Sequence, residues 1–484
     1  MLAGVDVGST HCKAVLCAPD GGVLARAERP TPGDPTGRTY DVRALTGAAL
    51  GALADCVRHA GRRPDAIGLT GMAETGALLD AGGEPLTPAL SWADPRPARY
   101  ADRLRREVGA GHLHAVTGIL PSAKVPLAKW LWLAAEEPGL VRRARRWAGA
   151  ADLVAQALTG VVATDGTFAQ RTMAWDPRAG AWHEDLLALA GLDAARMPDV
   201  RRPGEPAGRT ADGVPVVVAG HDHLVGAWAA GVRGPGQAAD SMGTAEAVLT
   251  VADHAPDPAA AAAQGMSYGR HADGEAWCVV AGLPSSGGLV EWFCDRFLGL
   301  ADRPSAERYA RFRALVAEAG DGPTGLLVEP YLAGRSAPLP DRGRRLAVHG
   351  LGAGHGLPQL ARALLEGAAH QARWMADVQG ELTGAAPASV TLLGGPVRLA
   401  EWTAIKAAVS PWRTRVCRAA EAPCLGAAAW AGAALGLDPT ALTCPVRILS
   451  APGDTGQAYQ REHRQRFLPA VTAPRPQPTE ESQP

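Results

Sequence analysis

Two segments about half a chain apart share one pattern, and this internal repeat constrains the fold more than any other feature. The segments are "GVDVGSTHCKAVL" (4–16) and "AADSMGTAEAVLT" (238–250). Each has an Asp, then Gly with Ser or Thr, then Ala-Val-Leu, although the spacing from Asp to Gly slips by one residue. Two strand–turn–strand hairpins of this kind predict two related lobes, and turns that face each other would line a cleft.

The size and charge of the chain agree with this organisation and exclude several classes of partner. A chain of 484 residues is too long for one ordinary hydrophobic core. Its 48 Lys+Arg against 49 Asp+Glu leave a net charge of -1, which gives no reason to expect nucleic acid or an anionic membrane as a partner. We also expect no signal peptide and no membrane span.

The cysteines indicate a reducing compartment. All eight are scattered outside CxxC pairs. A chain of this length needs no disulfide framework, so we expect buried thiols in a reducing cytoplasm.

Hydrophobic periodicity predicts an α/β protein. A buried strand is expected at 214–220, and a hairpin at 76–92 around a Gly-Gly pair. The Pro-rich, polar end of the chain, 471–484, is expected to be disordered. Helical spacing is expected at 44–60, 124–160, 286–299, 304–319, 357–380, 399–409 and 425–436.

Two short turns have the chemistry of phosphate-binding loops. In "DVGST" (6–10) the glycine lets a ligand approach the backbone, and Ser9 and Thr10 add hydroxyl donors. "SMGT" (241–244) offers the same groups, and a nucleotide polyphosphate needs donors from both sides. Asp6 beside the first turn suits Mg²⁺, which prefers oxygen ligands and keeps several waters. An ordinary hairpin explains either turn taken alone.

A third junction could also approach a nucleotide, whereas other nucleotide motifs fail. "LLGGPVRLAEW" (392–402) reads as a strand, a Gly-Gly turn and a helix, which can present free backbone N–H groups. There is no GxxxxGK[ST]. A GxGxxG at 320–325 follows a helical pattern and precedes a strand, the reverse of a dinucleotide site.

The segment "GHDHLVGA" (220–227) allows three interpretations of Asp222. A metal site is the least favoured, because zinc sites usually draw ligands from separate places and because Asp222 would point away from His221 and His223 on an extended strand. Asp222 could instead cap a helix that begins near Leu224. It could also be a general base that takes a proton from a hydroxyl attacking a γ-phosphate.

Taken in order, these motifs resemble the FGGY family of carbohydrate kinases, from about residue 2 to about 440. Residues 68–97, "GLTGMAETGALLDAGGEPLTPALSWADPRP", are similar to the family's strand, hairpin and W-x-D-x-R segment. Further blocks that match in order are "LAKWLWLAAEEP", "ADLVAQALTG", "EPYLAGRSAPLPD", "HGLGAGHGLPQLARALLEGAAHQARW" and "CLGAAAWAGAALG".

The resemblance implies an α/β fold of two actin-like, ribonuclease H-like lobes (the ASKHA fold) that hold ATP, Mg²⁺ and a sugar in the cleft between them. Residues 1–237 would form the sugar-binding lobe with Asp222 as catalytic base, and 238–470 the nucleotide-binding lobe. Asp6 would bind the metal, and a homodimer is compatible with the family. The residues implied at the nucleotide are Gly8, Ser9, Thr10, Lys13, Gly243, Thr244, Gly288, Gly394, Gly395 and Arg398.

The substrate pocket departs from the xylulose kinase and glycerol kinase patterns. Glu74 and Thr75 agree with the Gln-Arg-Glu-Thr of glycerol kinases, but the arginine is replaced by Ala73, and the Gln-Met-His of xylulose kinases is absent. Glu74 can accept two hydroxyl hydrogens, which suits a sugar or polyol. His223 stands where Asn or Gln is frequent. Two residues of the W-x-D-x-R segment also belong to the expected pocket: Trp92 and Asp94.

The expected activity is therefore phosphorylation of a xylulose-like ketose or a related polyol. A cyclitol or a sugar-bearing natural product is an alternative acceptor on the same fold. A rival of another class is a non-catalytic actin-like ATP-binding protein, against which Asp222 and the W-x-D-x-R segment argue.

Overall fold

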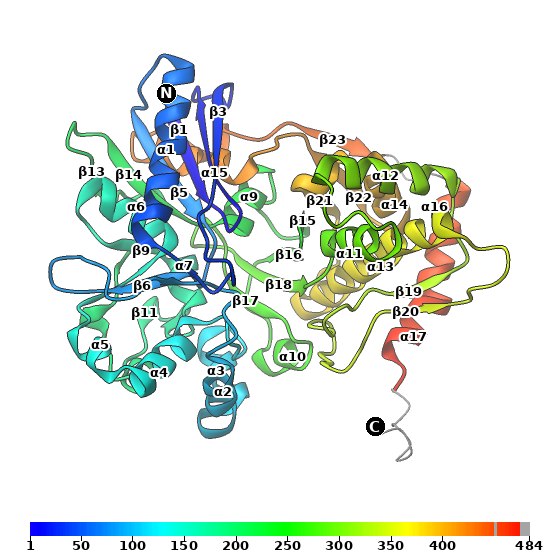
Figure 1. Ribbon diagram of the computed structural model, residues 1–484, viewed down its shortest axis with the longest axis horizontal. Helices are drawn as coiled ribbons and strands as arrows, with labels where there is room; N and C mark the ends of the chain where they lie inside the picture. The colour runs from blue at the N-terminus through cyan, green and yellow to red at the C-terminus, as the bar shows by residue number, and fades with distance from the viewer. Residues whose placement is uncertain (450–452, 475–484) are drawn as a thin grey trace.

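The computed structural model describes residues 1–449 and 453–474, and it has two lobes, each built on one large mixed β-sheet (Figure 1). The six-stranded sheet of the amino-terminal lobe has the order β13-β14-β5-β1-β2-β3. Its strands are β1 (Leu2–Val7), β2 (His11–Cys17), β3 (Val23–Pro30), β5 (Ala66–Gly71), β13 (Gly208–Arg209) and β14 (Pro215–His221).

The seven-stranded sheet of the carboxyl-terminal lobe has the order β17-β18-β16-β15-β21-β22-β23. Its strands are β15 (Gln237–Met242), β16 (Glu246–Ala252), β17 (Ser267–Arg270), β18 (Trp277–Leu283), β21 (Ser389–Leu393), β22 (Arg413–Cys417) and β23 (Val446–Leu449).

The two sheets repeat one topology. In the first, β1, β2 and β3 are antiparallel neighbours, and β5 and β14 continue parallel to β1. In the second, β15, β16 and β18 are the antiparallel neighbours, and β21 and β22 continue parallel to β15. The internal repeat of the sequence therefore marks the first hairpin of each lobe, and the prediction of two related α/β lobes is confirmed.

The one-residue slip between the repeats has a structural meaning. The last pairs of the two hairpins are Val7↔Cys12 and Met242↔Glu246. Counted from these pairs, Asp6 matches Ser241, and Asp240 lies one residue earlier. Successive side chains of a strand point to opposite faces, so Asp6 and Asp240 cannot have equivalent surroundings.

Helices cover both faces of the amino-terminal sheet. On one face, the buried core contains side chains of α1 and α6. The other face packs against α9, which follows β14, and against α15, which follows β22 of the other lobe. Figure 1 shows α9 and α15 where the two lobes meet. The bounds are α1 (Val42–Ala60), α6 (Ala150–Thr159), α9 (Asp222–Ala229) and α15 (Ala422–Ala433).

Glycines in two strands make the packing of α15 possible. A Cβ on Gly4 of β1 would lie 1.7 Å from the carbonyl oxygen of Cys424, and one on Gly68 of β5 would lie 1.9 Å from that of Ala427. No side chain fits at either position. The lobes therefore share a continuous buried core through α9 and α15.

The carboxyl-terminal lobe has its own core under a long buried helix, α13. Its sequence-predicted helices are confirmed with small shifts of their ends. The helices of this lobe are α10 (Pro258–Ala263), α11 (Gly287–Phe297), α12 (Ser305–Glu318), α13 (Leu357–Thr383), α14 (Ala400–Val409), α16 (Gly453–Glu462) and α17 (Leu468–Thr472), with a short pair of strands, β19 (Leu327–Glu329) and β20 (Ala347–His349).

The long segment between β5 and β14 forms a second, four-stranded sheet of order β4-β7-β6-β8, to which the segment before β5 contributes β4. The hairpin expected at 76–92 is present in it. The single helical stretch expected at 124–160 is wrong, because β8 interrupts it and pairs with β6. The elements are β4 (Thr39–Tyr40), β6 (Gly76–Leu79), β7 (Ala89–Leu90), β8 (Arg146–Gly149), α2 (Ala98–Leu104), α3 (Ala110–Thr117), α4 (Pro126–Glu136), α5 (Pro138–Arg143) and α7 (Gly166–Arg171).

Three other expectations concern the whole chain. All eight cysteines are free and buried, as predicted. No helix among residues 1–449 and 453–474 has both the length and the apolar character needed to cross a membrane. Helix α17 includes the first two residues of the tail expected to be disordered, and the part of that tail from 475 to 484 lies outside the described residues.

Candidate active site

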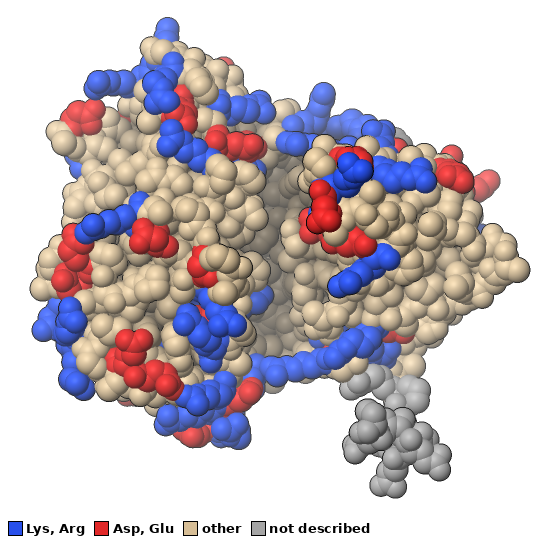
Figure 2. All heavy atoms as spheres, in the orientation of Figure 1, with Lys and Arg blue, Asp and Glu red and all other residues tan. Residues whose placement is uncertain are grey.

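A groove runs between the two lobes (Figure 2). Strands β1, β5 and β14 are parallel neighbours, so their carboxyl ends meet at one edge of the sheet. Asp6 lies at the end of β1, Glu74 shortly after β5, and Asp222 directly after β14. Topology thus gathers three carboxylates that are far apart in the sequence, at the edge where α/β sheets usually bind ligands.

Asp222 is a half-buried carboxylate at the first position of α9. Its Oδ1 accepts a hydrogen bond of 2.6 Å from the backbone N–H of His223 and lies 3.3 Å from Nε2 of His221. Burial raises the pKa of Asp222 to about 7, and the charge of Glu74 adds to the rise. No Lys or Arg side chain among the described residues forms an ion pair with it.

The capping interpretation is right only in part. The helix begins at Asp222 itself, so His221 occupies the N-cap position, and it makes no side-chain capping bond. Asp222 binds the N–H of the next residue instead of one deeper in the first turn. The bond still fixes the orientation of the carboxylate.

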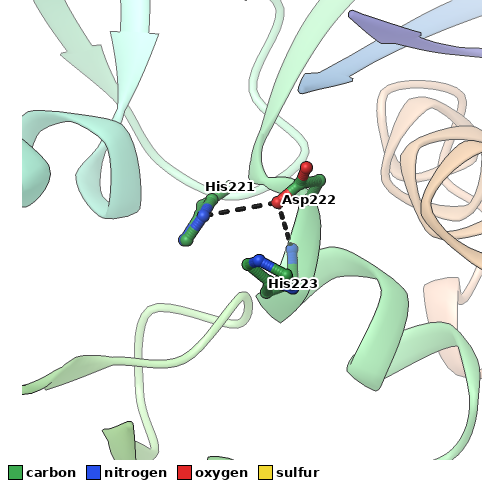
Figure 3. A group of neighbouring side chains, drawn as sticks. All are labelled: His221, Asp222 and His223. Atoms are coloured by element: carbon green, nitrogen blue, oxygen red, sulfur yellow. Dashed lines mark hydrogen bonds and ion pairs between the residues drawn. The ribbon is translucent and has the colours of Figure 1, made fainter. Parts of the chain in front are cut away.

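His221, Asp222 and His223 converge, contrary to the expectation that Asp222 points away (Figure 3). That expectation assumed an extended strand, but the chain changes from strand to helix between His221 and Asp222, so side chains no longer alternate. Burial lowers the pKa of His221 well below its usual range, and burial and Arg171 lower that of His223. Both imidazoles are therefore neutral at neutral pH.

Asp6 is the second acidic group of the cluster. Burial and the charge of the neighbouring Asp222 together raise its pKa to about 7. Its Oδ1 is buried and has no hydrogen-bond partner among the described residues. An unpartnered carboxylate oxygen beside a second carboxylate fits a hydrated divalent cation such as Mg²⁺. Lys13, on the adjoining strand β2, forms an ion pair of 3.1 Å with Glu421, which precedes α15.

The first phosphate-type turn, between β1 and β2, contains Gly8, Ser9 and Thr10. A Cβ on Gly8 would lie 2.7 Å from the carbonyl oxygen of His11, so the tight turn requires glycine. The hydroxyls of Ser9 and Thr10 form no hydrogen bond to any residue in the described part of the chain, and both are available to a ligand.

Glu74 is held in place by two cations that the sequence did not point to. Its backbone is in the left-handed region (φ 61°), which few residues other than glycine adopt. Lys129 of α4, which is buried, donates a 2.6 Å hydrogen bond to the Glu74 carbonyl. Arg171 of α7 binds the carboxylate through Nε at 2.9 Å and also through Nη2. Burial alone would raise the pKa of Glu74, but the charge of Arg171 holds it below its usual value.

The other residues predicted to bind the substrate, Thr75, Trp92 and Asp94, do not all lie at the acidic cluster. Thr75 is buried and its Oγ1 accepts from the backbone N–H of Trp92 at 3.0 Å, so it supports the indole segment. The exposed Lys124 places its Nζ 5.1 Å from the centre of the Trp92 ring. Asp94 is buried and its carboxylate is bound by the side chain of Arg96, so the structure does not bring it to the acidic cluster.

In the other lobe, the residues expected to bind the nucleotide lie around the hairpin of β15 and β16. The backbone N–H groups of Gly287 and Gly288 donate to the carbonyls of Gly243 and Thr244 at 2.9 and 3.0 Å. A Cβ on Gly394 would lie 2.0 Å from the carbonyl oxygen of Met242, so the Gly-Gly turn abuts the same hairpin. Beside this turn is a groove of about 420 Å³ lined by Gly394, Gly395, Arg398, Cys417, Arg418 and Arg447.

A buried ionic network supports this hairpin, and sequence reasoning missed it. Lys406 of α14 lies 2.5 Å from Asp240 and 2.8 Å from Glu246, one on each strand. Glu246 also accepts a hydrogen bond from Ser286. Asp240 was matched to Asp6 in the sequence, but it faces this network and not the cleft. Removing one partner would leave a buried charge unpaired, so the network fixes the turn between the strands.

Side chains from both lobes meet beside Asp222. Nδ1 of His223 lies 2.9 Å from Oγ of Ser241, which is on β15. The two residues belong to a cavity of about 40 Å³ whose wall also includes His221, Arg171 and Tyr268. Ligand pockets usually measure roughly 300–1,000 Å³, so this cavity is too small to hold a sugar in the conformation described.

Family comparison agrees with this geometry over nearly the whole chain. The model of the FGGY carbohydrate kinase amino-terminal domain matches residues 1–229, and that of the carboxyl-terminal domain matches residues 238–435. This chain belongs to the FGGY family of carbohydrate kinases. It is accordingly a carbohydrate kinase, and ATP is the phosphate donor of its family.

Individual relatives of this FGGY kinase match at least 96% of its length. Xylulose kinase of Streptomyces rubiginosus is 32% identical over 478 residues, which are 96% of this chain and 93% of that protein. Glycerol kinase of Rhodospirillum rubrum is 30% identical over 504 residues, 98% and 95% of the two chains. The crystal structure of xylulose kinase from Rhodospirillum rubrum superposes with a TM-score of 0.84 at 26% identity and covers 97% and 98% of the two chains.

These relatives act on different acceptors, so the family comparison leaves the acceptor undecided. The assignment of the lobes to sugar and nucleotide, the homodimer and the cytoplasmic location stay predictions.

Proposed function

We propose that this kinase phosphorylates one hydroxyl of a small sugar or polyol and that Asp222 is the general base. The observation that carries the proposal is the position of Asp222. This half-buried carboxylate is close to Glu74 on one side and to Asp6, beside the first phosphate-type turn, on the other. Its raised pKa, about 7, suits a base that must accept a proton near neutral pH. The deprotonated hydroxyl oxygen then attacks the γ-phosphorus in line with the leaving ADP.

The nucleotide side of the proposal rests on the two turns and the Gly-Gly groove. Ser9 and Thr10 face the phosphates from one lobe, and Gly243 and Thr244 from the other. The groove beside Gly394 is large enough for a nucleoside. Asp6 would hold a hydrated Mg²⁺ that, when bound, neutralises charge on the phosphates. Lys13 is kept near these groups by its ion pair with Glu421.

The acceptor side rests on Glu74. Arg171 keeps this carboxylate ionised, so it accepts two hydroxyl hydrogens and orients a polyhydroxylated substrate. Trp92 offers an apolar face to the sugar ring or chain, and His223 offers one neutral imidazole. A xylulose-like ketose or a related polyol satisfies these groups, and a cyclitol satisfies them as well.

Lys124 favours a second acceptor class, an acidic sugar. The ammonium group lies over Trp92 and has no ion-pair partner among the described residues. Its charge nevertheless acts on Glu74 and His223, so it is close to the acceptor groups. A carboxylate at the far end of an aldonate would pair with it.

Replacement of the base tests the mechanism. We expect Asp222→Asn to fold and to bind ATP, and kcat to fall by roughly 10²–10⁴-fold, the usual contribution of a general base. ADP release is measured with a coupled assay and ATP binding by calorimetry. Near-normal turnover would exclude Asp222 as the base. ATP binding with no effect of any sugar on ADP release in the unmodified enzyme would favour the non-catalytic alternative.

A substrate screen identifies the acceptor. Ketoses, polyols, cyclitols and aldonates are compared by kcat/KM in the same assay. If an aldonate is best, we expect Lys124→Met to lower its kcat/KM by about tenfold, which is the loss of one ion pair of about 1.4 kcal/mol, and to leave neutral acceptors unchanged. An equal effect on both classes would contradict the role of Lys124.

A further inference from the structure

His221, Asp222 and His223 have the geometry of a transition-metal site. Each offers one ligand atom, and the three atoms lie within 4.8 Å of one another. Around a tetrahedral ion bonded at about 2.0–2.2 Å, neighbouring ligand atoms are roughly 3.3–3.6 Å apart. The distance from Nε2 of His221 to Oδ1 of Asp222 is 3.3 Å, so one edge of such a tetrahedron is already formed. Small side-chain rotations bring in the third atom.

We propose that these three residues bind a divalent transition-metal ion, of which Zn²⁺ is the best match, at a site separate from Mg²⁺·ATP. Two imidazole nitrogens and one carboxylate suit Zn²⁺ or Co²⁺, whereas Mg²⁺ prefers oxygen ligands alone. Three protein ligands leave the fourth position open, as in zinc sites that exchange a small ligand.

The surroundings hold both histidines in place. Nδ1 of His223 contacts Oγ of Ser241 at 2.9 Å, which leaves Nε2 for an ion. The backbone N–H of His221 donates to Oγ1 of Thr167 at 2.9 Å and fixes the end of β14. A partner on the second ring nitrogen, as Ser241 is for His223, orients a ligand of a metal site and raises the affinity of the site. In Figure 3 the three side chains form a triangle, with the His221 ring to the left of the Asp222 carboxylate and the His223 ring below it.

Occupation of this site would stop phosphoryl transfer, an effect that rests on the proposed role of Asp222. An ion bound to the carboxylate takes the lone pair that must accept the proton of the substrate hydroxyl. We therefore expect Zn²⁺ to inhibit the kinase in competition with the sugar and not with ATP. Gly243, Thr244 and the groove beside Gly394 lie outside the cluster and would remain accessible to the nucleotide.

Cobalt titration of the metal-free protein tests binding without any turnover. We expect visible absorption of tetrahedral Co²⁺ at one equivalent, without the charge-transfer absorption of a cysteine ligand. Zn²⁺ should displace the ion and raise the melting temperature, whereas millimolar Mg²⁺ should leave it bound. Displacement by Mg²⁺, or the absence of Co²⁺ binding, would overturn the proposal.

Matched variants locate the ion. His221→Asn and His223→Asn should each weaken Co²⁺ binding by more than roughly 100-fold, because loss of an outer partner alone costs about 10–100-fold. The exposed His254 provides the control, and His254→Asn should bind as the unmodified protein does. Asp222→Asn tests the same cluster if a histidine variant does not fold. Equal affinity in all variants would place the ion elsewhere and refute the site.

Inhibition separates this proposal from the role of Asp222. Zn²⁺ should raise the apparent KM for the sugar at fixed kcat in the unmodified enzyme and in His254→Asn, and His223→Asn should require far more Zn²⁺. Binding at the cluster without inhibition would support the metal site and contradict Asp222 as the base.

Discussion

At the residue scale, Asp222 has its chemistry because the chain changes from β14 to α9 at this point. The turn of backbone brings the neighbouring N–H and an imidazole to its carboxylate and leaves no strong cation beside it. Glu74 is in the opposite situation, because Arg171 binds it directly. The pKa of Asp222 is therefore raised, whereas that of its neighbour Glu74 is lowered. Such a difference lets Asp222 act as a base while Glu74 stays ionised and accepts hydrogen bonds.

The pH dependence of the reaction follows from Asp222. Because the base must be ionised and its pKa is about 7, kcat/KM should fall about tenfold for each pH unit below 7 and level off above it. Rates of ADP formation between pH 5.5 and 8.5 at limiting sugar would establish the profile. A profile that is flat down to pH 5.5 would mean that the base has an ordinary carboxyl pKa or is another group.

The sequence pointed to Asp6, Asp222 and both phosphate-type turns because each has a local pattern. It did not point to Arg171 or Lys129. The ion pair between Arg171 and Glu74 joins residues 97 positions apart, and no spacing rule connects an arginine at the end of one helix to a glutamate after a strand. For Asp94 the motif misled the prediction. The W-x-D-x-R pattern suggested a pocket residue, but the pattern does not reveal that Arg96 binds the Asp94 carboxylate.

At the element scale, the long helices and buried strands were predictable because their apolar periodicity is strong over many residues. Strand β8 was not, because its four residues (Arg146–Gly149) become a strand only by pairing with β6. The matching of Asp6 with Asp240 failed for a related reason. Sequence similarity follows residue types, whereas the face of a strand follows the count from the turn.

The contact of α15 with β5 gives a stability prediction. Gly68→Ala would force a methyl group against the Ala427 carbonyl, and such overpacking costs roughly 1–3 kcal/mol in free energy of unfolding. Gly47→Ala is the matched control, because Gly47 is an exposed residue of α1 with open space around it. It should stabilise by about 0.5–1 kcal/mol. Urea unfolding measures both, and an equal effect of the two variants would contradict tight packing at Gly68.

At the scale of the whole molecule, the two lobes share a core through α9 and α15 and face each other across the groove. The cavity between His223 and Tyr268 is smaller than a usual ligand pocket, and we expect the lobes to open and close during the catalytic cycle. Closure would exclude water that could otherwise take the phosphoryl group of ATP.

Small-angle X-ray scattering can detect this motion. A compact chain of this length has a radius of gyration near roughly 23 Å. We expect an ATP analogue and the sugar together to lower the measured radius by a few per cent, and the analogue alone to have a smaller effect. A radius that is the same in all states would contradict closure, and the unliganded protein at several concentrations provides the control for association.

The packing of α15 also has a consequence for how the chain folds during its synthesis. Cys424 contacts the carbonyl of Lys13, 411 residues earlier in the sequence. At the usual 5–20 residues per second, a ribosome needs roughly 20–80 s to make the intervening chain. Strands β1 and β5 stay without α15 for that time, and their apolar surface must be shielded from other nascent chains until residues 422–433 have been translated.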